Sequence, residues 1–310
     1  MKRTGAARKG KRGKSKMKRL LVTGASGFLG SRIVKYYSGK WDVFAPGHSE
    51  MDITDTEKVY AVFKEFRPHA VIHSAAVSDV GKCDAEPEKS WKINVEGSRN
   101  IAAASAEFHS KCLLCSSDQV YFGSKIKEAH REDEAVSPGN TYGRQKKKAE
   151  EECLNRYPEC VILRLSWMYD IRTVNEYEHS DFFRTLLARL QAQEDLSYPV
   201  YDVRGITDVN EVICNLEKAM ESEGGIYNFG SPNDRNMYET VRAMFAELKW
   251  DAGRLKKNEE AFASNPRNIS MSPVKLNGSG ITFLPTLEAL IRNGSRIDAH
   301  RQNDKRQPEE

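Results

Sequence analysis

The sequence contains no run of about eighteen apolar residues, the length that a membrane-spanning helix needs. No apolar stretch follows the charged first residues, so we expect no secretory signal there. Cysteine is scarce, with 6 residues in 310, and only Cys112 and Cys115 form a CxxC pair. No second CxxC or histidine pair completes a zinc site. We therefore predict structural thiols, no metal site and a cytoplasmic location.

Acidic residues are absent from residues 1–16, which hold eight lysines and arginines. Without those eight charges the net charge changes from +4 to −4, so a basic tail precedes an acidic body. We expect this glycine-rich tail to be disordered because it has no apolar face. Nucleic-acid binding is one interpretation of it, and an upstream start codon before Met17 is the simpler one that we favour. We expect residues 294–310 to form a second, polar tail.

Short apolar runs alternate with helical patterns from Met17 to Trp167, which is typical of βαβ units and a parallel sheet. The predicted strands are RLLVTG, WDVFA, HAVIHSAA, KCLLCSS and CVILRLSW, and the predicted helices are 28–37, 54–66, 90–108 and 141–156. We therefore predict an α/β, Rossmann-type doubly wound sheet over residues 17–170. Later patterns predict helices at 180–192, 208–220 and 237–248 and a strand at GIYNFG. They indicate a smaller C-terminal α/β substrate lobe over residues 171–293, interleaved with the first.

The stretch TGASGFLG places Gly24, Gly27 and Gly30 between a predicted strand and a predicted helix. Glycines at this spacing allow a tight turn, close approach of a pyrophosphate and close packing of the helix on the strand. The start of the helix then offers free N–H groups to the phosphates. A glycine turn that serves packing alone is the alternative. We predict dinucleotide binding, with Phe28 and Leu29 also in contact.

The end of the second predicted strand reads Ala45-Pro46-Gly47-His48-Ser49, with no acidic residue before Glu50. An acid there normally binds the 2′-hydroxyl of NAD. Its absence favours NADPH over NADH, although only slightly because no arginine is present either. Asp52 has a simpler alternative role as a helix cap. Further predicted cofactor contacts are Ser49, Asp52, Ile53, Ser74, Ala75 and Ala76.

Tyr142 and Lys146 are four residues apart on a predicted helix, hence on one face. A lysine one turn away, helped by the positive charge of the nicotinamide, would lower the pKa of the tyrosine, which is normally near 10. The phenol would then be a usable proton donor. This spacing alone is common on solvated helices. Its position after a glycine turn, and after Ser117 at the end of the fourth predicted strand, makes it more specific.

These stretches together resemble the extended short-chain dehydrogenase/reductase family over residues 17–293. The resemblance rests on TGASGFLG, SAA, INVEG with Asn94, SSDQVY and YGRQK. It implies that Tyr142 is the general acid/base, that Lys146 is its partner and anchors the nicotinamide ribose, and that Ser117 holds the substrate oxygen. It adds Asn94 to the cofactor contacts and allows a homodimer.

The segments LRLSWMYD and NISMSPVKLNGSGITFLPTLEALIRN are similar to the dTDP-4-dehydrorhamnose reductase branch of this family. The branch implies NADPH- or NADH-dependent reduction of a nucleotide-linked 4-keto sugar, with Ser78 and Trp167 at the sugar. A buried core aromatic is the alternative for Trp167. The chain departs from the branch where Ser272 replaces an aspartate, where Val77 replaces a substrate-contacting tyrosine, and where SDQVYFG stands in place of the usual TDYVFDG.

Gln119 stands where similar sugar-nucleotide dehydratases have a glutamate that removes a proton next to the ketone. An amide cannot take that proton, so elimination is disfavoured and simple hydride transfer is compatible with the sequence. Asp118 is predicted to hydrogen-bond within the active site, or merely to cap the turn. Two other functions stay open. One is a non-catalytic NADP-binding subunit resembling the regulatory subunit of methionine adenosyltransferase, and the other is a sugar-nucleotide 4-epimerase.

Overall fold

The computed structural model describes residues 17–172, 174 and 181–304, with side chains described as far as residue 299. The expected basic tail at residues 1–16 lies outside the described residues. In the part of the chain that is described, no helix has the length and apolar character needed to cross a membrane.

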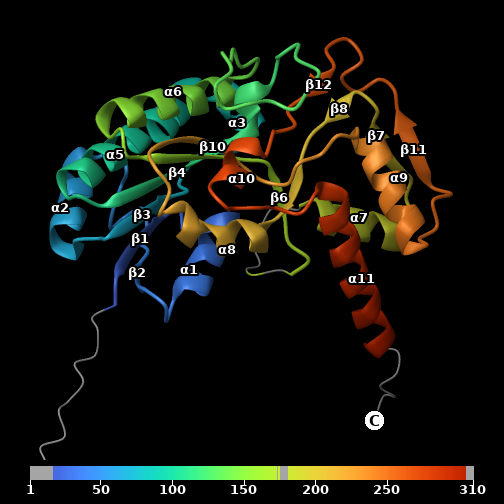
Figure 1. Cartoon of the computed structure of the whole chain (residues 1–310), viewed down its shortest axis with the longest axis horizontal. Helices are drawn as coiled ribbons and strands as arrows, with labels where there is room; N and C mark the ends of the chain where they lie inside the picture. The colour runs from blue at the N-terminus through green and yellow to red at the C-terminus, as the bar shows by residue number, and fades with distance from the viewer. Residues whose placement is uncertain (1–16, 173, 175–180, 305–310) are drawn as a thin grey trace, which may run out of the picture.

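A parallel sheet of six strands forms the centre of the larger lobe (Figure 1). The strands lie in the order β10-β5-β4-β3-β1-β2, and every neighbouring pair is parallel. Their bounds are β1 (Arg19–Thr23), β2 (Asp42–Phe44), β3 (Ala70–His73), β4 (Lys111–Ser117), β5 (Val161–Leu165) and β10 (Gly225–Phe229). The predicted Rossmann-type parallel sheet is confirmed.

Helices cover both faces of this sheet and create two hydrophobic cores. One face carries α1 (Phe28–Tyr37) and α8 (Val209–Ala219). The other face carries α2 (Thr56–Phe66), α5 (Ser98–Glu107) and α6 (Thr141–Arg156). Because side chains alternate along a strand, Leu20 and Val22 lie in the first core and Leu21 lies in the second. This burial on both faces explains why the strands are almost continuously apolar.

The helix after the second strand begins at Thr56, two residues later than predicted. Its cap is Asp55, whose side chain accepts the N–H groups of Glu57 and Lys58. Asp52 instead accepts from the N–H and the hydroxyl of Thr54, at 2.9 and 2.8 Å. Asp52 therefore closes a turn, and the interpretation of it as the helix cap is wrong.

The predicted helix 90–108 is part of a longer helical segment. Two short elements and a π-helical turn precede α5: α3 (Val80–Ala85), α4 (Pro87–Trp91) and η1 (Lys92–Gly97). A Cβ at Gly97 would lie 2.7 Å from Ile53 Cδ1, so glycine permits close packing of this turn on the loop before α2. This segment stands next to the loop after β3, where the cavity described below begins.

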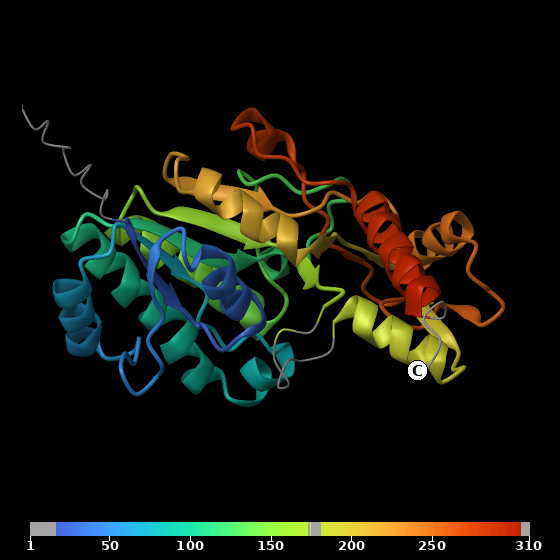
Figure 2. The same cartoon turned by 90° about the horizontal axis from the view of Figure 1, so that it is seen from below.

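Figure 2 shows the smaller lobe beside the larger one. The smaller lobe surrounds a third core rich in aromatic side chains. Its strands pair as β6–β9, β7–β11 and β8–β12. The elements of this part of the chain are β6 (Trp167–Tyr169), α7 (Phe182–Gln191), β7 (Leu196–Pro199), β8 (Asp202–Val203), β9 (Ile206–Asp208), α9 (Met237–Leu248), β11 (Leu255–Asn258), β12 (Arg267–Asn268) and α11 (Thr286–Asp304). The predicted fifth strand is thus divided, since β5 ends at Leu165 and β6 begins at Trp167.

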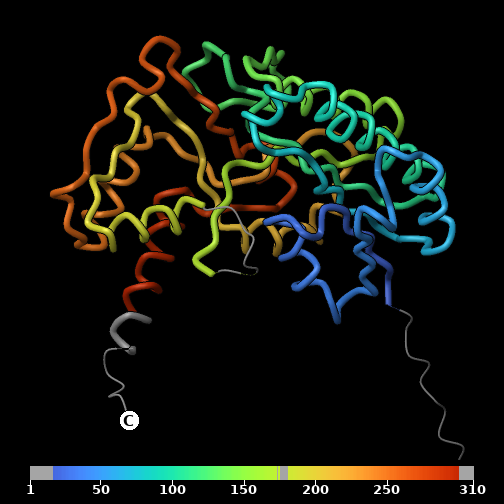
Figure 3. Tube along the Cα trace, turned by 180° about the vertical axis from the view of Figure 1, so that it is seen from behind, coloured from blue at the N-terminus to red at the C-terminus, as the bar shows by residue number. Residues whose placement is uncertain are grey.

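The chain passes between the two lobes more than once (Figure 3). Helix α8 packs on α1, β10 forms the edge of the large sheet, and α10 (Val274–Gly278) contacts β10. These segments lie between elements of the smaller lobe in sequence. The described lining of the cavity discussed below extends from Thr23 to Met168 and includes none of these crossing segments.

The expectation of a polar tail is wrong for residues 294–304, because α11 continues to Asp304. A Cβ at Gly294 would lie 2.3 Å from Leu248 Cδ1, so this glycine lets α11 pack closely on α9. Trp250 Nε1 also donates to Asp298 Oδ2 at 2.8 Å. Exposed positions such as Ser295 and Arg296 account for polar residues in the described part of this segment, while its contacts with α9 hold it in the fold.

Candidate active site

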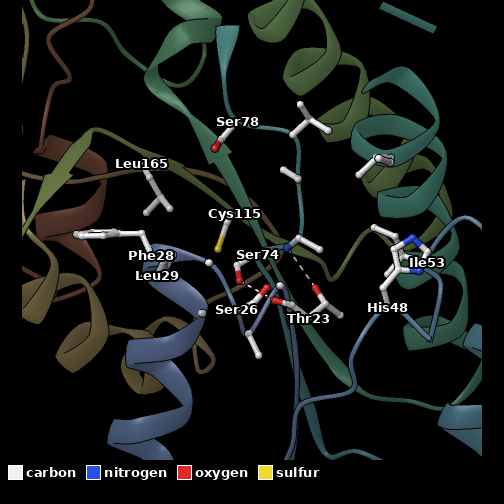
Figure 4. A pocket seen from close by; sticks show the side chains of 18 of the residues that line it. Thr23, Ser26, Phe28, Leu29, His48, Ile53, Ser74, Ser78, Cys115 and Leu165 are labelled. Atoms are coloured by element: carbon white, nitrogen blue, oxygen red, sulfur yellow. Dashed lines mark hydrogen bonds between the residues drawn. The ribbon is translucent and has the colours of Figure 1, made fainter. Parts of the chain in front are cut away.

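A cavity of about 720 Å³ lies at the carboxyl ends of the central strands (Figure 4). It includes the ends of β1 and β3, between which the strand order reverses. Ligands of open α/β sheets bind at such a reversal, and the volume is typical of cofactor and substrate sites. The predicted residues that line it are Gly24, Gly27, Phe28, Leu29, Gly30, Asp52, Ile53, Ser74, Ala75, Ala76, Ser78, Ser117, Tyr142 and Lys146.

The glycine turn after β1 has almost no space for side chains. Gly24 has a φ of +72°, and a Cβ there would lie 2.6 Å from the backbone nitrogen of Ala75. A Cβ at Gly30 would lie 2.1 Å from the carbonyl oxygen of Gly24. Gly27 is the N-cap of α1 and has no side chain with which to cap it. The first N–H groups of α1 are therefore available beside the cavity.

Ser117, Tyr142 and Lys146 meet on the opposite side of the cavity, and all three are buried. Ser117 ends β4, while Tyr142 and Lys146 share one face of α6. A Cβ at Gly143 would lie 2.3 Å from the carbonyl oxygen of Gln119, so glycine allows the start of α6 to approach the end of β4. Asn140 caps α6 by accepting the N–H of Gly143 at 2.7 Å. This local geometry places the phenol next to the Ser117 hydroxyl.

Burial shifts the pKa values of Tyr142 and Lys146. It raises the pKa of Tyr142 above its usual value, and the hydrogen bond with Ser117 offsets only part of that rise. Burial also lowers the pKa of Lys146, whose Nζ donates to the carbonyl oxygen of Cys115 at 2.9 Å. The lowered pKa of Tyr142 with Lys146 and a charged nicotinamide beside it stays a prediction, while in this structure desolvation of the phenol dominates. Tyr142 consequently holds its proton at neutral pH, as a proton donor must.

A buried ion pair connects the end of β4 to the smaller lobe. Asp118 Oδ2 lies 3.4 Å from Arg204 Nη2, and the two side chains are 3% and 13% exposed. Asp118 Oδ1 accepts the Ser117 hydroxyl at 3.2 Å. The Arg204 guanidinium also lies over the Trp167 ring, 5.0 Å from its centroid. Burial raises the pKa of Asp118, and the positive charges of Arg204 and Arg267 counteract that rise.

Arg204 was absent from the sequence-based site because its partner Asp118 is 86 residues away. Arg204 lies in the loop between β8 and β9 and belongs to no sequence motif that would have marked it. Arg204 contacts both Asp118 and Trp167, so it joins a residue predicted to be catalytic to one predicted to bind substrate.

Among the described residues, four predicted site residues do not line the cavity: Ser49, Asn94, Asp118 and Trp167. Asn94 is fully buried behind the loop after β3, where its side chain accepts from Val77 N at 2.8 Å and donates to Val77 O at 3.0 Å. It therefore positions this loop. Asp118 is engaged by Arg204 as described above. The buried-core interpretation of Trp167 is wrong, since 37% of it is exposed.

Ser49 is exposed, and the structure places its neighbour His48 on the cavity wall instead (Figure 4). The sequence contained a signal for this residue, because His48 lies in the segment between the second strand and MDITD in which a ribose contact was expected. The alternation of side chains in that loop could not be predicted, because it forms no regular strand.

The family described as RmlD substrate binding domain matches residues 17–293. The dTDP-4-dehydrorhamnose reductase of Streptomyces griseus is 33% identical over 257 residues, covering 80% of this chain and 82% of that protein. Methionine adenosyltransferase 2 subunit beta of Xenopus tropicalis is 27% identical over 283 residues, covering 85% and 83%. The solved structure of dTDP-4-dehydrorhamnose reductase from Bacillus anthracis in complex with NADP has a TM-score of 0.79 and 25% identity, covering 90% of this chain and 98% of that one.

Proposed function

Because the chain belongs to the RmlD substrate-binding domain family, we propose that it is an NADP-dependent reductase of a nucleotide-linked 4-keto sugar. The observation that carries this proposal is the meeting of Ser117, Tyr142 and Lys146 in one cavity with the glycine turn. The dTDP-4-dehydrorhamnose reductases to which the chain is similar supply the substrate class. The cytoplasm is the proposed location, in keeping with six unpaired cysteines.

The residues present fit a nicotinamide dinucleotide. The glycine turn and the start of α1 present main-chain N–H groups, and the residues next to Gly24 are small. A pyrophosphate would be held there. Lys146 would hold the ribose next to the nicotinamide, as the family resemblance implies. When bound, the reduced cofactor supplies the hydride that the keto carbon accepts.

The protein's own contribution is to deliver a proton and to stabilise charge on the substrate oxygen. Tyr142, kept protonated by burial, donates its proton to that oxygen. Ser117 donates a second hydrogen bond, for which its hydroxyl must turn from Asp118 toward the substrate. Lys146 Nζ lies 5.7 Å from the centre of the Tyr142 ring. As an ammonium group it would stabilise the phenolate that remains after the proton has been transferred.

Gln119 supports reduction over elimination. Its amide nitrogen lies 3.4 Å from Asp118 Oδ1, and its amide oxygen accepts from Asn140 Nδ2 at 3.0 Å. The side chain thus belongs to a buried network, and an amide has no basic atom with which to remove a carbon-bound proton. Dehydration of the sugar would need a base at another position.

A second candidate function is a cofactor-binding regulatory subunit. It is favoured by the alignment of the methionine adenosyltransferase subunit with 85% of this chain, and by Val77 and Ser272 in place of two residues typical of the reductase branch. In this candidate, the cavity binds NADPH without turnover.

Incubation with NADPH and a panel of dTDP- and UDP-linked 4-keto sugars separates the two functions. We expect NADPH oxidation that depends on the sugar, with the corresponding 4-hydroxy sugar as the product. Tight NADPH binding without turnover of any sugar in the panel would contradict the reductase and support the regulatory subunit.

A further inference from the structure

Glu150 is a buried acid of α6 that the reaction described above does not use. It is 2% exposed and lies four residues after Lys146 on the buried face of that helix. Residues at this spacing have their Cβ atoms about 5–6 Å apart. A buried carboxylate is costly unless it is paired and hydrogen-bonded. The groups that contact Glu150 therefore indicate what it does.

Three hydrogen bonds hold the Glu150 carboxylate. Arg164 of β5 donates from Nε to Oε1 at 3.0 Å and from Nη2 to Oε2 at 2.7 Å. Ser116 of β4 donates its hydroxyl to Oε1 at 2.5 Å. These partners all donate, as an ionised carboxylate requires, and the two-point ion pair with Arg164 fixes its orientation.

The contacts of Glu150 lead directly to the wall of the cavity. Ser116 and its neighbour Cys115 both line the cavity, and both are tied to α6. Lys146 Nζ donates to the carbonyl oxygen of Cys115 at 2.9 Å, while Glu150 holds the side chain of Ser116. Ser117 is the next residue of β4. Glu150 thus fixes the end of the strand between the carbonyl that binds Lys146 and the hydroxyl predicted to bind the substrate.

Glu150 also supplies negative charge near the Lys146 ammonium. Burial lowers the pKa of Lys146, and the groups that counteract this fall are Cys115, Cys153, Glu150 and Cys83. Burial raises the pKa of Cys115 to about 12, and it raises the pKa values of Cys153 and Cys83 as well. These thiols are therefore uncharged at neutral pH, which leaves Glu150 as the anion among those four groups.

The other ionisable groups around this pair come from several elements. Tyr142 lies one turn before Lys146, with its ring centre 5.7 Å from Nζ, and burial raises its pKa. Arg164 and Tyr121 lie on the side of the carboxylate, and burial raises the pKa of Tyr121 to about 12. Burial, and to a smaller extent the charge of Lys146, lowers the pKa of His73 to about 3. Lys146 is therefore the group of this set whose charge can change in the mildly basic range.

We propose that Glu150 is a positioning residue of the cofactor site, which holds the end of β4 against α6 and keeps a negative charge one helical turn from the Lys146 ammonium. An ammonium group forms stronger hydrogen bonds than a neutral amine, so the charge on Lys146 strengthens its contact with the nicotinamide ribose. Glu150 is outside the described lining of the cavity and acts through Lys146 and Ser116. The inference rests on the proposed function for the identity of the cofactor, and it needs no keto sugar.

Dissociation constants for NADPH, measured by fluorescence titration at about pH 6.5 and about pH 8.5, test this role. Glu150→Gln keeps the shape of the side chain and removes its charge, so Lys146 should lose its proton at a lower pH. NADPH binding should weaken by about 5- to 10-fold relative to wild type at the higher pH and by no more than about twofold at the lower pH. Glu151→Gln is the matched control and should change neither constant, because Glu151 is exposed and pairs with Lys147 and Lys148 at 3.6 and 3.7 Å.

Glu150→Asp separates the effect of charge from the effect of packing. It keeps the negative charge but shortens the side chain, so it disturbs the bonds with Ser116 and Arg164. Its NADPH affinity relative to wild type should therefore be the same at both pH values. A loss of affinity in Glu150→Gln that is equal at both pH values, or no loss at either, would overturn the proposal and show that Glu150 serves the fold alone.

Melting temperatures accompany these titrations, because Glu150→Gln leaves the Arg164 guanidinium without its counter-charge. If that variant does not fold, Glu150→Gln with Arg164→Met removes both charges. The same pH-dependent loss is expected of this double variant at a smaller size, and its absence would equally overturn the proposal.

A Lys146→Met background tests whether Glu150 acts through the ammonium. Without that group, Glu150→Gln should add no pH-dependent loss of NADPH affinity, and a loss that persists would assign the effect to another residue. Failure of the wild type to bind NADPH would instead contradict the proposed function. Binding without turnover of any keto sugar leaves these measurements decisive.

Discussion

The cofactor and substrate sides of the candidate site are built in different ways. The cofactor wall consists of the glycine turn and the small residues after β3, where main-chain atoms lie so close that a Cβ at Gly24 or Gly30 would collide with backbone. The proposed substrate wall lies outside the described lining of the cavity and consists of charged and aromatic side chains, with Asp118 from one lobe and Arg204 and Trp167 from the segments that lead into the other. The cofactor wall depends on residues with little or no side chain, and the substrate wall depends on paired charges.

Substitutions at the two walls should therefore impair the protein in different ways. Added volume should damage the cofactor wall and leave its electrostatics unchanged. Removed charge should damage the substrate wall and leave cofactor binding nearly intact. A substitution of Tyr142 should impair the reaction without impairing binding at either wall.

Tyr142→Phe should have the largest effect, a loss of ketone reduction on the order of 100-fold or more. The substitution removes the proton donor but keeps the ring and its packing, so the dissociation constant of NADPH should not change. Steady-state kinetics with a 4-keto sugar nucleotide and fluorescence titration with NADPH measure the two quantities. Activity within about threefold of wild type would show that another group donates the proton.

Gly30→Ala should weaken NADPH binding by roughly tenfold and destabilise the fold by about 1–3 kcal/mol. The new Cβ would lie 2.1 Å from the carbonyl oxygen of Gly24, so the turn or the start of α1 must move. Gly278→Ala is the matched control, since a Cβ there has no neighbour within 4 Å. Thermal unfolding and NADPH titration of both variants check the result. Normal NADPH binding by Gly30→Ala would mean that the cofactor wall adapts to added volume.

Arg204→Met should have the smallest effect, and its sign depends on pH. The raised pKa of Asp118 means that the folded protein holds this proton more tightly than the unfolded chain does. The corresponding stability is present below the unfolded pKa and is lost as the pH rises through the folded pKa. Without Arg204 the carboxylate loses its main counter-charge, so the loss at high pH should increase.

The melting temperature of Arg204→Met should therefore fall further below wild type at about pH 8 than at about pH 5, by a difference equivalent to about 1–2 kcal/mol. NADPH affinity should be unchanged, because the pair lies outside the cofactor wall. Adding Asp118→Asn should remove the extra pH dependence, as expected if the two charges are coupled. A deficit that is equal at both pH values would show that Arg204 acts through packing on Trp167 alone.

Local patterns in the sequence were sufficient for the central sheet and for most of the cofactor wall. The strands of the central sheet were marked by short apolar runs, and the bounds of α1, α6 and α9 agree with the predicted 28–37, 141–156 and 237–248. Asp52 and Ser49 were less predictable, since an exposed loop has no periodicity. The helical path of residues 294–304 was missed because Gly294 resembles a helix end until Leu248 is seen to pack against it.

The sequence by itself determined the order of strands and helices, the glycine turn and the shared face of Tyr142 and Lys146, because each depends on residues a few positions apart. Only the tertiary structure decided that the Tyr142 pKa rises, that Arg204 pairs with Asp118, and that His48 reaches the cavity while Glu50 turns away. Burial and ion pairing depend on which distant segments meet. No spacing along the chain contains that information.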